Sequence, residues 1–326
     1  MTRSPATGLD HAIDNPFLAG KHKPIVVGHR GVPHLHQENT LAGFRRAVAL
    51  GLPAVELDVR ITKDGRAVCV HDSNLRRLTG TAVHVTDLTW DEISKLRIRR
   101  ELPMGHDAHG KPVIQRYDRE ETIPLLAEVL AETAAALVLN VELKIELPRW
   151  WRIEAPAIVA AEITRAKVAN RVIVTSFDPR TLLATRRASR EIAVGFCFDD
   201  TMLDFAGALL DRLPPLPIHL EQHHHKRRGH NARRLLNRLL ESDIAGRLFG
   251  TRLVGADHTL VGRGTVEALH RQGVAIGTHT LFPLGSATGK PIASTAATVD
   301  EVDRLVRLGV DWIESDDPEQ LQQLIG

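Results

Sequence analysis

Short runs of apolar, β-branched residues alternate with longer helical patterns along most of the chain. The first run, Ile25 to Gly28, is followed by a helical pattern from about Thr40 to Leu50 and by a second run over Ala54 to Val59. Six further runs of this kind cover residues 137–143, 172–176, 192–198, 253–256, 274–278 and 310–315. Repetition of strand and helix over this length is typical of a parallel α/β fold, and eight units favour a closed TIM (β/α)8 barrel.

Two segments depart from this alternation. The apolar run Ala67 to His71 begins soon after the second strand, with a turn signal at 63–65 between them. A parallel crossover needs about a dozen residues, so we expect an antiparallel hairpin that returns His71 toward the second strand. The stretch 199–252, after the fifth strand, is longer than a single returning helix requires. We expect a helical, lid-like insertion there, on the face where barrel enzymes build their sites.

Composition is consistent with one barrel domain. The chain has 326 residues, of which 43% are hydrophobic and 25% charged, and contains no long low-complexity linker. We therefore predict a barrel over 25–326 preceded by an extension over 1–24. The formal net charge is only +2, so nothing marks the chain as a nucleic-acid binder. Cys69 and Cys197 each lie in an apolar run, which favours buried, reduced thiols.

Hydropathy and local charge bear on location and partners. No run approaches the ~20 apolar residues of a membrane span, and the first fifteen residues are polar where a signal peptide would be apolar. We expect a cytoplasmic protein. The segment Lys226–Arg238 contains six basic residues and no acidic one, and the leucines within and after it predict a basic amphipathic helix. Such a helix contacts an anionic lipid surface, steers substrates or, most commonly, packs with a solvated basic rim. The sequence indicates no oligomeric state.

Carboxylates with a spacing of two form the first candidate site. Glu56 and Asp58 point to the same face of a strand. Inside a barrel, two uncompensated carboxylates are costly unless a cation or a base joins them. Glu142 and Lys144 repeat the spacing on the third strand. Three inward carboxylates suit Mg²⁺ or Ca²⁺, but a buried ion-pair network with Arg30 and Lys144 explains the spacing equally well, and both interpretations stay open.

Two histidines lie on the same predicted face. His29 and Arg30 close the first strand, where they could serve as an acid/base beside an anion clamp. A single histidine at such a place is more often a hydrogen-bonded core residue. The functional interpretation is favoured because His29, His71 and the carboxylates all fall at strand ends or at the hairpin on one face of the barrel.

Taken in order, these motifs resemble the glycerophosphodiester phosphodiesterase family. The similarity covers about residues 25–321. It is carried by Gly28–Gly31, Glu38–Thr40, Glu56–Val59, Thr62–Gly65, His71–Asp72, Ile123–Leu130, Glu142–Lys144, Ser176–Phe177 and Gly309–Asp316. No single motif is decisive, but the ordered set is highly specific.

The resemblance implies a phospholipase-C-like TIM barrel that hydrolyses a glycerol phosphodiester with a divalent cation, Mg²⁺ or Ca²⁺. In this set, His29 and His71 take the acid/base roles. The cation is held by Glu56, Asp58 and Glu142, and the small-molecule substrate is bound by Arg30, Lys144 and Phe177. The family's route is attack by the glycerol 2-hydroxyl to give a cyclic phosphate, which water then opens. The sequence does not assign which histidine is the base.

Some positions depart from the family pattern or carry two interpretations. Where the family usually has Trp-Thr-Val-Asn after its seventh strand, this chain has residues 278–281. His279 there is either a polar replacement contact or, as we slightly favour, an exposed histidine. Asn39 or Thr40 is expected to cap the first helix. Asp72 and Asp316 are expected either to orient catalytic groups or to serve in turns and caps.

Two other functions remain alternatives. One is a lysophospholipase D-type reaction, with residues 199–252 accommodating an acyl chain. The other is a non-catalytic phosphate-binding barrel, against which the retention of both histidines and all three carboxylates argues.

Overall fold

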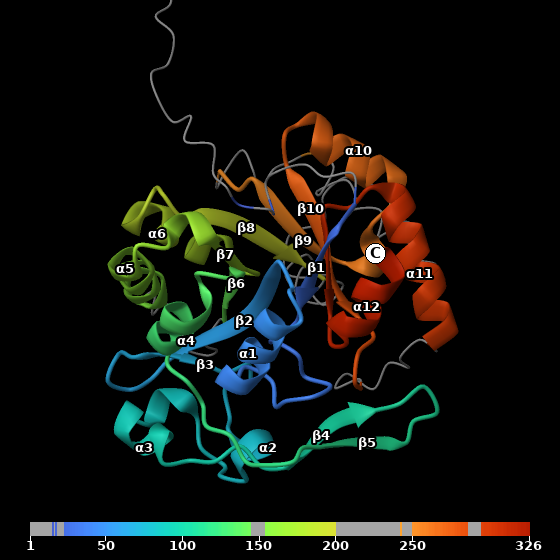
Figure 1. The fold of residues 1–326 in the computed structure, drawn as a ribbon. Coiled ribbons are helices and arrows are strands. Elements are labelled where there is room, and N and C mark those ends of the chain that lie inside the picture. The colour runs from blue at the N-terminus through green and yellow to red at the C-terminus, as the bar shows by residue number, and fades with distance from the viewer. Residues whose placement is uncertain are drawn as a thin grey trace, which may run out of the picture.

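Eight parallel strands form a closed barrel in the computed structural model, which describes residues 15, 17, 23–144, 154–199, 242, 250–285 and 295–326. In the order of hydrogen-bonded neighbours they are β1 (Ile25–Gly28), β11 (Trp312–Ser315), β10 (Ala275–Leu281), β9 (Leu253–Asp257), β8 (Ala193–Phe198), β7 (Val172–Ser176), β6 (Val138–Leu143) and β2 (Ala54–Ile61). Pairing of Val27 with Ala54 and of Gly28 with Val55 joins β1 to β2 and closes the ring (Figure 1). The predicted TIM barrel is confirmed.

Helices surround the barrel on its outside (Figure 1). They are α1 (Leu41–Ala49), α4 (Leu126–Thr133), α5 (Ala155–Ala166), α6 (Pro179–Ala188), α10 (Arg263–Arg271), α11 (Thr295–Leu308) and α12 (Pro318–Ile325). The alternation in β2 explains the packing, because Val55, Leu57 and Val59 join the core shared with α4 residues such as Leu126. The intervening Glu56 and Asp58 therefore point into the barrel.

The amino-terminal end of the barrel interior is filled by apolar side chains. Val27, Ile173 and Trp312 belong to a buried cluster that includes Phe17, which precedes β1. The rings of Phe17 and Trp312 meet edge to face with centroids 5.2 Å apart. Trp312 fits because the neighbouring strand has Gly277, where a Cβ would lie 1.8 Å from the indole. Since this end is closed by packing, the polar side chains collect at the opposite, carboxyl-terminal end.

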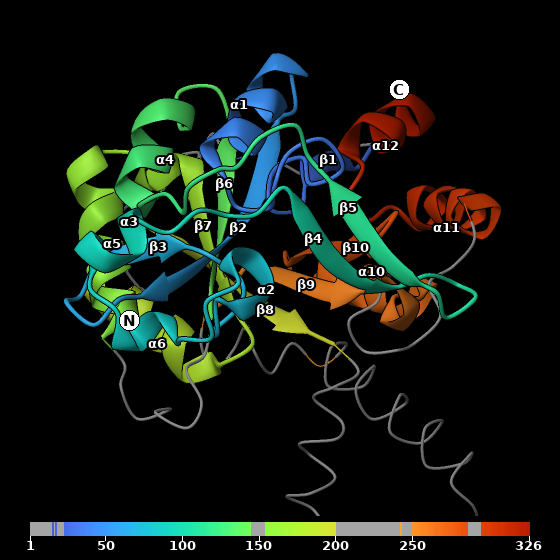
Figure 2. The same ribbon diagram turned by 90° about the horizontal axis from the view of Figure 1, so that it is seen from below.

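A returning strand and a small module follow β2. The strand β3 (Ala67–Cys69) pairs antiparallel with the end of β2, after a turn in which Thr62 donates to Asp64 at 2.6 Å. Residues 70–125 then form what we term the 70–125 module, which contains α2 (Arg76–Thr79), α3 (Trp90–Ser94) and the antiparallel pair β4 (Glu101–His106) and β5 (Pro112–Arg116). It lies along one side of the barrel, as Figures 1 and 2 both show.

The 70–125 module has its own buried cluster, which includes Leu75, Leu78, Ile93 and Leu102. The sequence patterns above predicted the hairpin strand but not this module. Its helices and strands, including a short 3-10 helix at Val85–Asp87, have three to six residues each, too short to produce a clear helical or strand periodicity.

Several sequence predictions concern residues that the structure does not describe. The insertion 199–252 falls in this category except for residues 199, 242 and 250–252, as does the basic segment Lys226–Arg238. These predictions stay untested. Among the described helices, none combines the length and hydropathy of a membrane span. Cys69 and Cys197 are free, buried thiols, as expected.

Candidate active site

A cavity of about 240 Å³ opens at the carboxyl-terminal end of the barrel. Seven of the eight predicted site residues line it: His29, Arg30, Glu56, His71, Glu142, Lys144 and Phe177. The eighth, Asp58, is fully buried beside them and pairs with two of the lining cations. The sequence could only assign these residues to one face of the barrel. The structure brings them together from four strands and the hairpin.

The three predicted carboxylates form a compact cluster. Ligand atoms of Glu56, Asp58 and Glu142 lie within 4.8 Å of one another. Lys144 Nζ lies 2.8 Å from Asp58 Oδ1 and 2.5 Å from Glu142 Oε1, and Arg30 Nε lies 3.2 Å from Asp58 Oδ2. Burial alone would raise the pKa of Asp58, but Lys144 and Arg30 hold it well below its usual range. The ion-pair interpretation therefore accounts for Asp58 and Glu142.

The ion pairs of Arg30 and Lys144 do not account for Glu56. Its Oε2 accepts the Arg30 backbone N–H at 2.9 Å, whereas its buried Oε1 has no hydrogen-bond partner among the described residues. Burial raises the pKa of Glu56, and the charges of Asp58, Glu314 and Glu142 raise it further. An unpartnered buried oxygen beside two more carboxylates fits a hard divalent cation, since oxygen ligands are what Mg²⁺ and Ca²⁺ prefer. The cluster can hold such an ion.

Asn39 fixes the position of Asp58. Its Nδ2 donates to Asp58 Oδ2 at 2.7 Å, and its Oδ1 accepts the Asp58 backbone N–H at 2.9 Å. Asn39 adopts φ +57°, a conformation that asparagine tolerates better than most residues. Thr40 is the helix cap, accepting from the Gly43 backbone N–H. The expectation of a cap at 39 or 40 is thus met by Thr40 alone, while Asn39 belongs to the site.

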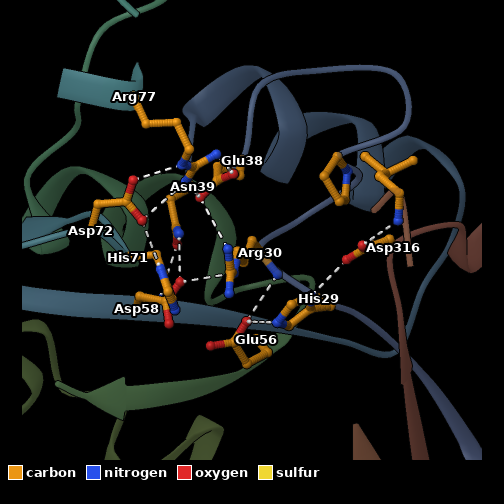
Figure 3. A network of polar contacts seen from close by, with 12 residues as sticks. His29, Arg30, Glu38, Asn39, Glu56, Asp58, His71, Asp72, Arg77 and Asp316 are labelled. Atoms are coloured by element: carbon orange, nitrogen blue, oxygen red, sulfur yellow. Dashed lines mark hydrogen bonds and ion pairs between the residues drawn. The ribbon is translucent and has the colours of Figure 1, made fainter. Parts of the chain in front are cut away.

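Each predicted catalytic histidine is paired with a carboxylate (Figure 3). His29 Nδ1 lies 2.6 Å from Asp316 Oδ1, and its Nε2 lies 3.9 Å from Glu56 Oε2. His71 Nδ1 lies 2.9 Å from Asp72 Oδ1. Such pairing fixes the ring orientation and favours the tautomer that leaves Nε2 available. Both Asp72 and Asp316 contact a histidine, as the orienting interpretation expects, and Asp316 Oδ2 also accepts the Leu284 backbone N–H at 3.0 Å.

Burial sets the protonation of His71. It lowers the pKa of the imidazole, and the charge of Arg30 lowers it further, while Asp58 and Asp72 oppose the shift. The neutral form, which can accept a proton, is therefore favoured near neutral pH.

Part of the cavity wall is aromatic. Phe177 follows β7, and its ring meets that of His279 edge to face with centroids 6.1 Å apart. His279 lines the cavity, and burial lowers its pKa. The favoured expectation of an exposed histidine was wrong. Residue 279 lies two positions after Gly277 on the same strand, so the two residues face the same side of the sheet. Because Gly277 packs on the interior Trp312, residue 279 points into the barrel.

Below the carboxylates lies a polar layer that the sequence interpretation missed. Asn140 Nδ2 donates to Glu314 Oε1 at 2.9 Å, and Thr175 Oγ1 donates to Asn140 Oδ1 at 2.8 Å. Burial raises the pKa of Glu314 to about 7. Glu314 on β11 and Asp316 directly after the strand have the same spacing of two that identified Glu56 and Asp58, so the signal could have been found.

The arrangement can bind an anion, place a divalent cation against it and move protons on two sides of it. Arg30 and Lys144 are fixed cations, the three carboxylates could hold a divalent cation, and His29 and His71 have the chemistry to carry protons within the same cavity. Fold and site together define a phosphodiesterase of the (β/α)8-barrel type.

Comparison with known proteins identifies the family. Residues 29–320 match the model of the glycerophosphoryl diester phosphodiesterase family, so the chain belongs to that family. A glycerophosphodiester phosphodiesterase from Caldanaerobacter subterraneus subsp. tengcongensis is 32% identical over 177 residues, covering 54% of this chain and 67% of that protein. The mouse lysophospholipase D GDPD1 is 34% identical over 119 residues, covering 36% of each chain.

Solved structures show the same fold. The phosphodiesterase from Oleispira antarctica, in complex with the product sn-glycerol-3-phosphate, aligns with a TM-score of 0.63 at 19% identity, covering 96% of this chain and 99% of that one. The glycerophosphodiester phosphodiesterase from Thermotoga maritima aligns with a TM-score of 0.58 at 22% identity, covering 93% and 99%. At these identities the likeness concerns the barrel alone.

Proposed function

We propose that this protein hydrolyses glycerophosphodiesters, such as deacylated phospholipids, to glycerol phosphate and a free alcohol. The observation that carries the proposal is the cavity itself, in which two histidine–carboxylate pairs flank a carboxylate cluster and two fixed cations. The product named for the Oleispira antarctica structure, sn-glycerol-3-phosphate, agrees with this substrate class.

In the proposed reaction, Arg30 and Lys144 bind the phosphate oxygens, and Phe177 packs on the glycerol side. Attack of the glycerol 2-hydroxyl on phosphorus passes its proton to one histidine, while the other, as an imidazolium, gives its proton to the departing alcohol. The resulting cyclic phosphate is opened by water with the two roles reversed, which restores both histidines. A divalent cation held by Glu56, Asp58 and Glu142 would polarise the phosphoryl oxygens and offset their developing charge.

Cavity size favours a small substrate over a lysophospholipid. The volume of about 240 Å³ is below the ~300 Å³ at which sites for drug-sized ligands begin. It suits a glycerol phosphodiester with a compact head group, and the acyl chain of a lysophospholipid would have to extend beyond this volume. Because the mouse relative is named a lysophospholipase D, the experiment below also includes a lysophospholipid.

Three substrates and three metal conditions test the function. Glycerophosphocholine, glycerophosphoethanolamine and lysophosphatidylcholine are each incubated with Mg²⁺, Ca²⁺ or EDTA, and the released alcohol and phosphate ester are measured. We expect cation-dependent release of glycerol phosphate from the two deacylated diesters. Full activity in EDTA would count against the cation site. Faster turnover of lysophosphatidylcholine would establish the alternative, and binding of phosphate without any turnover would indicate a non-catalytic barrel.

A further inference from the structure

One arginine of the 70–125 module reaches the candidate site. Arg77, on α2, donates from Nη1 and Nη2 to the two oxygens of Glu38 at 2.8 and 2.7 Å. The same guanidinium donates from Nε to Asp72 Oδ2 at 2.6 Å and from Nη2 to Asp72 Oδ1 at 3.2 Å (Figure 3). Its backbone carbonyl accepts from the Arg99 side chain at 2.8 Å. Arg77 thus joins two carboxylates that come from different parts of the chain.

The first carboxylate, Glu38, supports the phosphate-binding arginine. Its side chain is only 1% exposed, and its Oε1 also accepts from Arg30 Nη1 at 3.1 Å. Burial alone would raise the pKa of Glu38, but the charges of Arg30 and Arg77 lower it to about 2. A desolvated carboxylate requires full pairing. Because Arg77 supplies two of the three hydrogen bonds to Glu38 among the described residues, Arg30 makes one hydrogen bond to this carboxylate beside its ion pair with Asp58, and keeps other N–H groups for an anion.

The second carboxylate, Asp72, supports the proton carrier. Its Oδ1 lies 2.9 Å from His71 Nδ1, and both of its oxygens accept hydrogen bonds from Arg77. A carboxylate held by a planar fork of donors has a fixed direction, which a single point charge would not impose. The orientation of the His71 ring therefore depends on Arg77 through Asp72.

Two side chains of the same module hold the backbone of the loop that follows Arg30. Tyr117 Oη donates to the Pro33 carbonyl at 2.8 Å, and Gln115 Nε2 donates to the His34 carbonyl at 2.9 Å. Arg30 itself adopts φ +55°, an uncommon conformation that persists only when its surroundings determine it. The module therefore sets the place of the loop, and Arg77 joins the module to Glu38.

We propose that Arg77 is a positioning residue for the hydrolysis. It orients the Arg30 guanidinium through Glu38 and the His71 imidazole through Asp72, so that anion binding and proton transfer depend on one side chain of the 70–125 module. The proposal rests on the proposed function, since it assigns Arg77 to the support of Arg30 and His71 in that reaction.

The test compares Arg77→Met with Arg45→Met. Arg45 is a matched control because it forms a similar fork on Glu132, at 2.7 and 2.8 Å, on the outside of the barrel. For each purified variant we would measure kcat and KM with glycerophosphoethanolamine, the Kd for sn-glycerol-3-phosphate by calorimetry, and the Tm. For Arg77→Met we expect kcat to fall and KM to rise, with kcat/KM lower by about 100-fold and Kd weaker by about tenfold. Arg45→Met should leave kcat, KM and Kd unchanged.

Rescue separates positioning from a merely structural role. Guanidinium ion at low millimolar concentration should restore part of the activity and affinity of Arg77→Met but not affect the control variant. Arg77→Lys, which keeps the charge without the fork, should show an intermediate loss, and takes the place of Arg77→Met if that variant does not fold.

Unchanged kcat, KM and Kd in folded Arg77→Met, or in folded Arg77→Lys if the methionine variant does not fold, would overturn the proposal. So would a loss in folded Arg77→Met that guanidinium does not relieve. The Kd for sn-glycerol-3-phosphate tests Arg77 independently of turnover. A wild-type protein that binds this ligand but hydrolyses no diester would refute the proposed function, while the Arg77 comparison still decides the positioning role.

Discussion

Glu56 offers a direct test of the cation site, because its contribution to stability changes sign with the cation. Glu56→Gln removes a buried carboxylate whose pKa is raised by burial and by its acidic neighbours. A carboxyl group with a raised pKa stabilises the fold fully below its ordinary pKa and loses that contribution as the pH rises through the raised value. At pH 8 in EDTA the variant should therefore be at least as stable as the wild-type protein. With a divalent cation it should be less stable.

The expected size follows from mass action. A cation at 100 times its Kd stabilises the wild-type fold by about 2.7 kcal/mol. For 326 residues, an unfolding entropy of ~2.1 cal/mol/K per residue gives ~0.7 kcal/mol/K, so the Tm of the wild-type protein should rise by about 4 °C. Glu56→Gln has lost a ligand and should show less than half of this rise.

Differential scanning fluorimetry in EDTA, Mg²⁺ and Ca²⁺ measures both effects. Glu101→Gln, which alters an exposed carboxylate paired with Arg116, is the control and should behave as the wild-type protein. If the Tm of the wild-type protein is the same in EDTA and in both cations, the reasoning is refuted. The cluster of Glu56, Asp58 and Glu142 is then a purely internal ion-pair network with Arg30 and Lys144.

Three further predictions concern catalysis, pH and the pocket wall. His29→Ala and His71→Ala should each lower kcat by a factor of ~100 or more while the cation-dependent rise in Tm persists, and near-normal turnover in both would remove the acid/base assignment. Glu314, with a pKa raised from 4.5 to about 7, stabilises the fold fully below pH ~4.5 and loses that contribution as the pH rises through 7. In urea unfolding in EDTA, the free energy of unfolding of the wild-type protein should fall by at most about 3 kcal/mol between pH 5 and pH 8 because of this group. The free energy of unfolding of Glu314→Gln should fall by correspondingly less. Identical pH profiles for the two proteins would contradict the raised pKa. His279→Ala, which opens the wall against Phe177, should raise KM for glycerophosphocholine about tenfold with little change in kcat, and an unchanged KM would place the ring outside the substrate path.

Much of the site was visible in the sequence because strands have a period of two. Glu56 and Asp58 share a face of β2, and the buried Val55, Leu57 and Val59 share the other, as the alternation requires. The short connection before β3 predicted the antiparallel return that brings His71 back. These inferences are local, since they depend only on spacing within one or two strands.

Other parts of the site have no local signature. Asn39 binds Asp58 across 19 residues, and Arg77 binds Glu38 across 39. His279 lies in the cavity wall because of its position along β10 and the closure of the barrel, whereas the sequence slightly favoured an exposed histidine. The 70–125 module was missed because its elements are too short for a periodic pattern.

By itself, the sequence determined the eight barrel strands and the face on which the carboxylates lie. It also placed His29 at the end of a strand and His71 at the hairpin. The reason is that side-chain alternation and connection length are properties of consecutive residues. Only the tertiary structure decided that Glu56 has an oxygen without a partner among the described residues, that Asp316 and Asp72 contact the histidines, and that Arg77 pairs with Asp72. Those features depend on distances between residues far apart in the chain, which exist only after the barrel has closed and the module has packed against it.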